Sequence, residues 1–455
     1  MELIKQWVDA FNNSASVLQI FVLLAVGLFL TVYFGFIQFR KLPHALRVVR
    51  GKYDDPSDPG DISHFKALTT ALSATVGVGN IAGVALAVQI GGPGAVFWMW
   101  VTAALGMATK FAECSLGHKY RKTLPDQSVS GGPMYYIEEA FGTLSPKIGK
   151  FMGVFFATAF VFLAMNIGNL IQANTAAETL SASYGVNPLF VGIGLALLLF
   201  VVIIGGVKRI GDVTSKLVPT MASLYVGFAL LIILMNIGAI VPCFKLIFSD
   251  AFNGTAATGG FIGSSFLIAA RMGIARGLFS NEAGMGSAPI AHSAAKTKES
   301  ISQGVVAILE PFIDTICICT ITALVILMTG VWETSELQGA ALTVHGFTSG
   351  LPTGLISLGT HVINLGILLF AFSTIISWSY YGEQALVYLS GAKYIKIYRL
   401  FQCVVTVVGS VFALELVWAL GDFFIFFTTI PNLIAIMLLI GVLKKETKTY
   451  FEKFS

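Results

Sequence analysis

The segment Ser73–Val88, SATVGVGNIAGVALAV, decides how this chain is read, because three glycines and an asparagine interrupt an apolar run. Glycine inside a helix costs roughly 1 kcal/mol relative to alanine, so Gly77, Gly79 and Gly83 together weaken one short stretch. Two interpretations are open. Either Gly79 and Gly83 form a small-residue face for close helix packing, or the helix is broken at 76–80 and its free backbone groups line a cavity.

The composition places this segment in a membrane protein. The chain has 455 residues, of which 56% are hydrophobic and only 11% are charged, whereas soluble domains carry about 25% charged residues. The five cysteines show no spacing typical of a metal or disulfide framework. A span needs about 20 mostly apolar residues, and we predict an all-α polytopic membrane protein with eleven transmembrane helices, at residues 17–38, 66–90, 93–117, 150–180, 188–207, 216–241, 258–293, 301–330, 354–389, 396–414 and 417–442.

The distribution of basic residues predicts the orientation of the chain in the membrane. Lys and Arg beside a span resist translocation, and assigning alternate loops to the cytoplasm places 23 of the 28 Lys and Arg residues there. We therefore expect a multi-pass protein of the cell (plasma) membrane, with its N-terminus outside and its C-terminus in the cytoplasm. The net charge of +4 follows from this topology and gives no reason to expect nucleic acid as a partner.

A second interrupted span favours the broken-helix interpretation. Residues 276–289, RGLFSNEAGMGSAP, place glycines, a proline and polar side chains inside the seventh apolar segment. Two interrupted spans, each opening a five-helix unit, indicate a secondary transporter built from inverted repeats. We predict an extra N-terminal transmembrane helix and cytoplasmic loop at 1–65, a first five-helix repeat at 66–257, a second, inverted repeat at 258–442 and a cytoplasmic tail at 443–455.

Four stretches in order carry a resemblance to a known family. They are residues 70–113, which contain VGVGN, residues 130–141 (SGGPMYYIEEAF), residues 276–289 and residues 370–384 (FAFSTIISWSYYGEQ). They resemble the alanine or glycine:cation symporter family (sodium:alanine symporters) of the amino acid, polyamine and organocation superfamily. The resemblance implies a leucine-transporter-type 5+5 inverted repeat with broken helices plus one extra N-terminal helix, and sodium-driven uptake of alanine or glycine.

A zwitterionic amino acid needs donors for its carboxylate and acceptors for its ammonium group. The half-helix after the first break points its N-terminal amides at the expected cavity, so we predict that the amides of Val78 and Gly79 hold the carboxylate. Gly77 lets the backbone approach the ligand. The ammonium group is expected at the second break, near Phe279, Ser280 and Asn281.

Further candidates come from two other spans. Gln172 is predicted to hydrogen-bond the substrate from the side, and the alternative is a hydrogen bond between helices. Phe279 and Trp378 are predicted to limit the side-chain pocket, because apolar walls exclude extra methylenes only when they are bulky and rigid. The alternative for both aromatics is packing against neighbouring helices or lipid.

Sodium takes oxygen ligands, and span nine offers three hydroxyls, from Ser373, Thr374 and Ser377. The resemblance implies that they meet the carbonyls of Ser73 and Val76 at the first break. The alternative is that each hydroxyl bonds to its own helix. The resemblance to bacterial sodium:leucine symporters, whose break reads VGLGN, also matches Thr75 and Asn80 to a second sodium site, and we count both among the predicted substrate-binding residues.

Charged residues inside spans need a partner or a role. Lys110 and Glu113 are three residues apart and are expected to pair, whereas Glu310 and Asp314 either carry protons or pair with Arg271 or Arg276.

The sequence predicts a sodium-coupled symporter that imports small neutral amino acids by alternating access, with sodium as coupling ion, the lipid bilayer as partner and no other cofactor. The alternatives are proton coupling, or a carrier for another neutral amino acid such as serine or glutamine. A channel and an intramembrane enzyme are disfavoured, because we find no rings of charge and no catalytic constellation.

Overall fold

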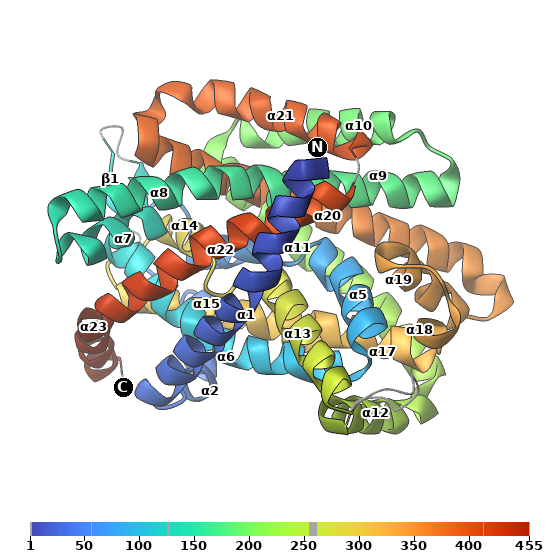
Figure 1. Ribbon diagram of the computed structural model, residues 1–455. Coiled ribbons are helices and arrows are strands. Elements are labelled where there is room, and N and C mark those ends of the chain that lie inside the picture. The colour runs from blue at the N-terminus through green and yellow to red at the C-terminus, as the bar shows by residue number, and fades with distance from the viewer. Residues whose placement is uncertain (1, 56, 125–127, 254–261, 413, 455) are drawn as a thin grey trace.

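The computed structural model describes residues 2–55, 57–124, 128–253, 262–412 and 414–454 (Figure 1). Most of these residues are helical, which confirms the all-α prediction. The strands among the described residues are β1 (Lys122–Thr123) and β2 (Val129–Ser130), which form a small antiparallel hairpin.

The N-terminal part consists of α1 (Glu2–Tyr33), α2 (Ile37–Arg40) and α3 (Leu42–Val49). Helix α1 starts well before the predicted span, since the polar stretch ahead of it is helical too. It ends at Tyr33, and the chain turns into α2 at Gly35 and Phe36, which adopt the left-handed conformation with φ 61° and 56°. Helix α1 lies alongside α22 (Leu414–Leu438), as Figure 1 shows, and Phe11 contacts Phe423 and Phe427 there at ring distances of 5.0 and 5.5 Å.

The next part of the chain contains the first interrupted span. Its elements are α4 (His64–Thr75), η1 (Val78–Asn80), α5 (Ala82–Gly91), α6 (Gly94–Lys119), α7 (Pro133–Gly142), α8 (Pro146–Met165), the π-helical segment η2 (Asn166–Leu170), α9 (Ile171–Tyr184), α10 (Pro188–Ile203), α11 (Gly206–Met235), η3 (Ile237–Ala239) and α12 (Ile240–Asn253). Proline at the first helical position, where its missing N–H costs nothing, starts α7, α8 and α10.

The remaining part contains the second interrupted span. Its elements are α13 (Ile262–Asn281), α14 (Ala288–Ser293), α15 (Ser300–Ala307), α16 (Leu309–Pro311), the π-helical segment η5 (Phe312–Cys319), α17 (Thr320–Met328), α18 (Val331–Thr334), α19 (Gly339–Ser349), η6 (Thr353–Leu355), α20 (Ile356–Ser390), η7 (Gly391–Tyr394), α21 (Ile395–Val411), α22 and α23 (Ile440–Lys453).

The two interrupted spans pair crosswise. The half before the first break, α4, packs against the half after the second, α14, and α5 packs against α13. This is the pairing expected of two antiparallel broken spans. Helix α20 packs against α4 and α8, and almost every residue from Ala67 to Val88 is buried. The two breaks therefore face each other inside the molecule.

Eleven spans are not confirmed. Among the described residues, seven helices are long and apolar enough to cross a membrane, or eight if the bent pair α4 and α5 is one span. Helix α10 is apolar but has only 16 residues. Residues 353–411 form one continuous helical stretch of 59 residues that contains both α20 and α21, so two predicted spans fall within it. The seventh predicted span, 258–293, begins outside the described residues. The division into two five-helix repeats stays a prediction.

Candidate functional site

The first break lies where the glycines predict it. Helix α4 ends at Thr75, Val76 leaves helical geometry with ψ 85°, and Gly77 is extended with φ −137° before α5 resumes. The two halves are bent by 57°. A methyl group on Gly83 would meet nothing within 4 Å, so this glycine makes no close helix contact. The broken-helix interpretation is therefore the correct one.

The second break runs from Glu282 to Ser287. Glu282 has a left-handed backbone, with φ 56°, which is uncommon for a residue other than glycine. Its carboxylate is held from both sides, because Trp378 Nε1 donates to Oε1 at 3.0 Å and Ser287 Oγ donates to Oε2 at 2.5 Å. Glu282 was not among the predicted site residues, and a strained backbone at a buried polar residue is typical of functional sites.

A small cavity lies between the two breaks. It is lined by Ala74, Thr75, Gly77, Gly79, Ile167, Gln172, Phe279, Glu282 and Trp378. Six of these are predicted substrate-binding residues. The cavity has a volume of about 10 Å³, which is close to the minimum for a single water molecule. A cavity of this size is too small for an amino acid unless its walls move apart.

Two amides at the first break already have side-chain acceptors. The Val78 amide donates to Gln172 Oε1 at 3.2 Å, and the Gly77 amide donates to Asn80 Oδ1 at 2.9 Å. Gln172 therefore lies against the amide that we expected to hold a carboxylate. Ser280 and Asn281 lie behind the cavity and do not line it. Their side chains face η5.

The predicted hydroxyl cluster faces the first break. Ser373 Oγ lies 3.3 Å from the Ser73 carbonyl and 3.5 Å from the Val76 carbonyl, and Thr374 Oγ1 lies 3.2 Å from the Ser73 carbonyl. The Phe370 carbonyl, 2.9 Å from Ser373 Oγ, adds an oxygen that residue type does not reveal. These oxygens are the ligands that a hard cation prefers. Ser377 Oγ instead donates to the Thr70 carbonyl at 2.8 Å. Thr70 lies one turn before Ser73 on α4, so Ser377 is not part of the cluster.

The sequence matches the sodium:alanine symporter family over residues 1–455. The chain belongs to this family. It is therefore a multi-pass membrane protein and a sodium-coupled amino acid transporter.

Individual proteins agree with this assignment. The sodium/alanine symporter AgcS of Methanococcus maripaludis is 46% identical over 434 residues, which cover 95% of this chain and 93% of that protein. The probable sodium/glutamine symporter GlnT of Bacillus subtilis is 36% identical over 436 residues, which cover 96% of this chain and 88% of that protein. The solved structure of MhsT in complex with L-phenylalanine has a TM-score of 0.61 at 15% identity, over 84% of this chain and 90% of that one, which shows a shared fold.

Asp314 joins the first break of this sodium:alanine symporter family member to the π-helical segment η5. Its buried carboxylate accepts hydrogen bonds from Asn80 Nδ2 at 2.6 Å, from Ser280 Oγ at 2.8 Å and from Thr315 Oγ1 at 2.7 Å. Asn80 and Ser280 thus share one acceptor. The sequence predicts Asp314 to be a proton carrier or a partner of an arginine, but it does not reveal the contact with Asn80, because the two residues are 234 positions apart.

The buried charges pair differently from the prediction. Lys110 does not bond to Glu113 on its own helix. Its Nζ lies 3.0 Å from Glu310 Oε2, while His292 Nε2 lies 2.7 Å from Glu310 Oε1. Glu113 accepts from Asn432 Nδ2 at 2.9 Å instead. The pairing runs between helices because α15 and α16 pack against α6.

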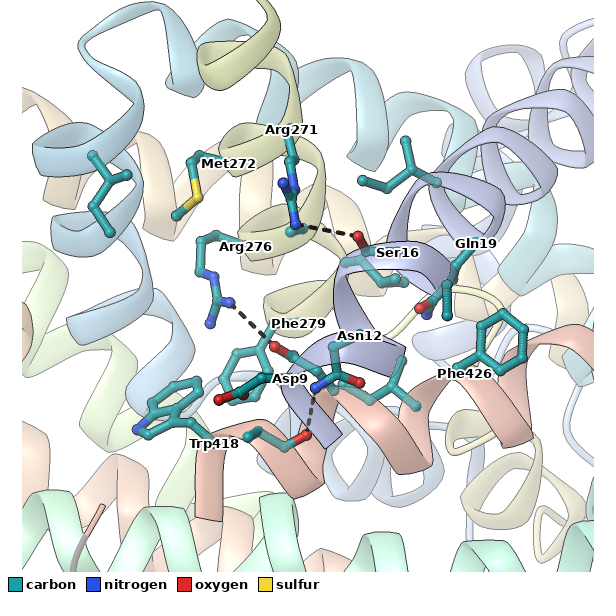
Figure 2. A pocket seen from close by; sticks show the side chains of 18 of the residues that line it. Asp9, Asn12, Ser16, Gln19, Arg271, Met272, Arg276, Phe279, Trp418 and Phe426 are labelled. Carbon is teal, nitrogen blue, oxygen red and sulfur yellow. Dashed lines mark hydrogen bonds and ion pairs between the residues drawn. The ribbon is translucent and has the colours of Figure 1, made fainter. Parts of the chain in front are cut away.

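Neither arginine of α13 reaches those acids. Arg276 pairs with Asp422 at 3.8 Å, and Arg271 donates to Ser16 Oγ at 3.3 Å. The predicted pairing of Glu310 or Asp314 with Arg271 or Arg276 is therefore not what the structure shows. Both arginines line a second cavity of about 720 Å³ between α1, α13 and α22, shown in Figure 2.

Phe279 is the wall between the large cavity and the small one, because it lines both. Its ring lies 4.9 Å from the ring of Trp418, and the guanidinium of Arg276 lies 5.7 and 5.3 Å from the centres of these two rings. A cation against aromatic faces is attractive. These three side chains, seen together in Figure 2, close the small cavity on this side.

Proposed function

We propose that this symporter imports small neutral amino acids, alanine or glycine, together with sodium by alternating access. The observation that carries the proposal is the cavity between the breaks, which brings six predicted substrate residues together. The backbone at Gly77 and Gly79 supplies polar groups, whereas Phe279 and Trp378 are bulky. Such walls suit a ligand that is little more than an amino acid backbone.

The backbone from Ser73 to Gly77 supports coupling between ion and substrate. The carbonyls of Ser73 and Val76 face the hydroxyl cluster, and Gly77 lines the cavity. A cation held by those carbonyls fixes the same short segment that shapes the substrate site. Binding of either one thereby favours binding of the other, as reciprocal coupling requires.

Alternating access requires one barrier on each side of the cavity. Phe279 with Trp418 and Arg276 forms the barrier toward the large cavity. On the other side, the half-helices α4 and α14 are joined through α15, because Gln303 bonds to both His292 and His64. We infer that transport opens these two barriers in turn.

The proposed orientation has the N-terminus outside and the C-terminus in the cytoplasm. Its support is the contact between α3 and α23, where His44 Nε2 and Tyr450 Oη lie 2.8 Å apart. The basic loop after α1 and the lysine-rich C-terminal helix therefore lie together, as expected if both are cytoplasmic. Since α1 crosses away from this end, the N-terminus lies on the other side.

Two alternatives have their own support. Proton coupling is favoured by the buried carboxyl of Asp314, which bridges the first break and η5. Transport of another neutral amino acid is supported by the relative GlnT, which is described as a probable sodium/glutamine symporter.

Uptake of a panel of amino acids into proteoliposomes, under an imposed sodium or proton gradient, tests the proposal. We expect alanine or glycine uptake that requires sodium. Full uptake on a proton gradient without sodium would overturn sodium coupling, and a preference for serine or glutamine would overturn the substrate. Counterflow of labelled alanine separates a carrier, which exchanges, from a channel.

A further inference from the structure

A basic pocket of about 440 Å³ lies at the end of α1 that leads into α2 and α3. It is lined by five lysines and arginines and one histidine: Arg40, Lys41, His44, Arg47, Lys52 and Lys453. Among the described residues that line it, none is acidic. The pocket belongs neither to the cavity between the breaks nor to the path that leads to it.

Most of this charge has no acidic partner among the described residues, although Arg40 Nη1 donates to the Gly35 carbonyl at 3.1 Å. Lys453 pairs with Glu299 at 2.5 Å. The ion pairs among the described residues include none of Arg40, Lys41, Arg47 and Lys52. Like charges that face one pocket repel one another, and an anion between them relieves the repulsion.

Burial and the repulsion between these basic groups lower the pKa values of two of them, Lys41 and His44. Burial, followed by the charges of three basic neighbours, lowers the pKa of His44 to about 4. The pKa of Lys41 is also lowered, first by burial and then by Arg40 and Arg47. His44 is therefore neutral at pH 7, and its ring is free to bond Tyr450 while the surrounding cations carry the positive charge.

Aromatic rings from two distant parts of the chain, the loop after α3 and the C-terminal α23 with the residue that follows it, meet beside these basic groups. The ring of Tyr53 lies 5.2 Å from that of His44 and 5.2 Å from that of Phe454, and Lys41 Nζ lies 3.9 Å from the centre of the Phe451 ring. The walls therefore come from α3, the loop after it and α23. A ligand in the pocket ties the C-terminal helix to the end of α1.

The surface beside the pocket is apolar. Phe36, Phe39 and Leu46 are 52%, 55% and 44% exposed, on and beside the short helices α2 and α3. Short helices with one apolar and one basic face lie at the boundary between lipid headgroups and acyl chains. A cluster of four or more basic residues directly beside a membrane span is typical of sites for anionic headgroups.

We propose that this pocket binds the phosphate of an anionic phospholipid headgroup, whose acyl chains lie along Phe36, Phe39 and Leu46. Arg40, Lys41 and Arg47 supply the charge-assisted hydrogen bonds. The proposed orientation assigns this lipid to the cytoplasmic leaflet, and binding itself does not depend on transport. The occupied site holds α23 against α3 and so raises the stability of the folded protein.

The test compares phosphatidylglycerol with phosphatidylcholine as probes. Purified full-length protein in detergent is titrated with each lipid, and bound lipid is counted by native mass spectrometry while the unfolding temperature is followed. Inorganic phosphate alone forms a third arm. The pocket variant is Arg40→Gln/Lys41→Gln/Arg47→Gln, and its matched control, Lys393→Gln/Lys396→Gln/Lys445→Gln, removes the same charge from basic residues outside the pocket.

We expect phosphatidylglycerol to bind and to raise the unfolding temperature, and phosphatidylcholine to do neither. Each basic residue contributes a factor of about five near an anionic surface, so the pocket variant binds about a hundredfold more weakly. The control variant is expected to bind phosphatidylglycerol as the unmodified protein does, with the same rise in unfolding temperature. If the triple variant is unfolded, Arg47→Gln alone still tests the site with a loss of about fivefold.

Three results would overturn the proposal. Equal losses in the pocket variant and the control would mean a diffuse attraction between charges. An effect of inorganic phosphate as large as that of phosphatidylglycerol would mean a site for small anions instead of a lipid. Equal binding of both lipids would remove the role of the headgroup charge. Each result is independent of alanine uptake, so failure here leaves the proposed function intact.

Discussion

Gln172 Oε1 accepts a hydrogen bond from the Val78 amide at 3.2 Å, while Gln172 Nε2 donates to the Ile167 carbonyl at 3.1 Å. The side chain is thus fixed with its oxygen on the amide that we propose for the substrate carboxylate. We infer that Gln172 satisfies this amide while the cavity is closed and yields it when an amino acid binds.

Gln172→Glu keeps the shape of this side chain and adds a negative charge. The new carboxylate repels that of the substrate and holds the Val78 amide more strongly, so we expect the KM for alanine to rise at least about tenfold. The control is Gln338→Glu, an exposed position with the same change of charge. An unchanged KM in Gln172→Glu would mean that the carboxylate binds elsewhere.

Gly79 and Gly83 form a matched pair for testing the first break. A methyl group on Gly79 would lie 3.2 Å from Phe279 Cδ1 and 3.3 Å from Ser280 Cα, whereas one on Gly83 would meet nothing within 4 Å. We expect Gly79→Ala to abolish alanine binding in a folded protein and Gly83→Ala to bind normally. Binding is measured by isothermal titration, and alaninol, which lacks the carboxylate, should not compete. Competition by alaninol would contradict the carboxylate clamp.

Ser373 and Ser377 lie one turn apart on α20, and they are predicted to differ in their effect on sodium dependence. Ser373→Ala and Thr374→Val each remove an oxygen that faces the carbonyls of the first break, so we expect the sodium concentration for half-maximal uptake to rise at least about tenfold. Ser377→Ala should change it much less, because Ser377 bonds to Thr70 instead. Sodium titrations of alanine uptake measure all three variants. A larger effect of Ser377→Ala would restore the predicted role of that residue.

Local signals predict some of these features from the sequence and not others. The break at Gly77 follows from the glycines that interrupt an apolar run, and the contact of Ser373 and Thr374 with that break follows from the resemblance to a known family. The pairing of Lys110 with Glu310 does not, because helix packing decides whether a charge meets a neighbour three residues away or a partner 200 residues away. The Phe370 carbonyl also escapes prediction, since every residue type has one.

The buried pair of Lys110 and Glu310 predicts a large effect on stability. Both side chains are fully buried, and removing one partner of such a pair leaves an uncompensated charge, which costs about 3–5 kcal/mol. We therefore expect Lys110→Met to lower the unfolding temperature strongly and Lys110→Met/Glu310→Gln to recover most of the loss. Thermal unfolding in detergent measures both. Equal destabilisation in the single and double variants would mean that His292 and not Lys110 balances Glu310.

The last prediction concerns the size of the substrate, which we propose is limited by Phe279 and Trp378, since both line the small cavity. Trp378 is also structural, because it stacks on Phe160 at 5.5 Å and donates to Glu282, so Trp378→Ala carries the usual cost of about 3–5 kcal/mol for a large core truncation. Phe279 borders the large cavity and tolerates truncation better. We expect Phe279→Ala and, where it folds, Trp378→Ala to admit leucine or methionine while alanine binds more weakly.

Competition against labelled alanine in purified, folded variants measures this change in selectivity. One methylene in an apolar pocket is worth about 1–3 kcal/mol, so leucine should gain at least about tenfold relative to alanine in Phe279→Ala. Trp418→Ala is the control, because Trp418 packs on the outer side of Phe279 and does not line the small cavity. If both cavity variants still reject leucine, then Phe279 only closes the path to the large cavity, and Gln172 becomes the next candidate for the wall that sets substrate size.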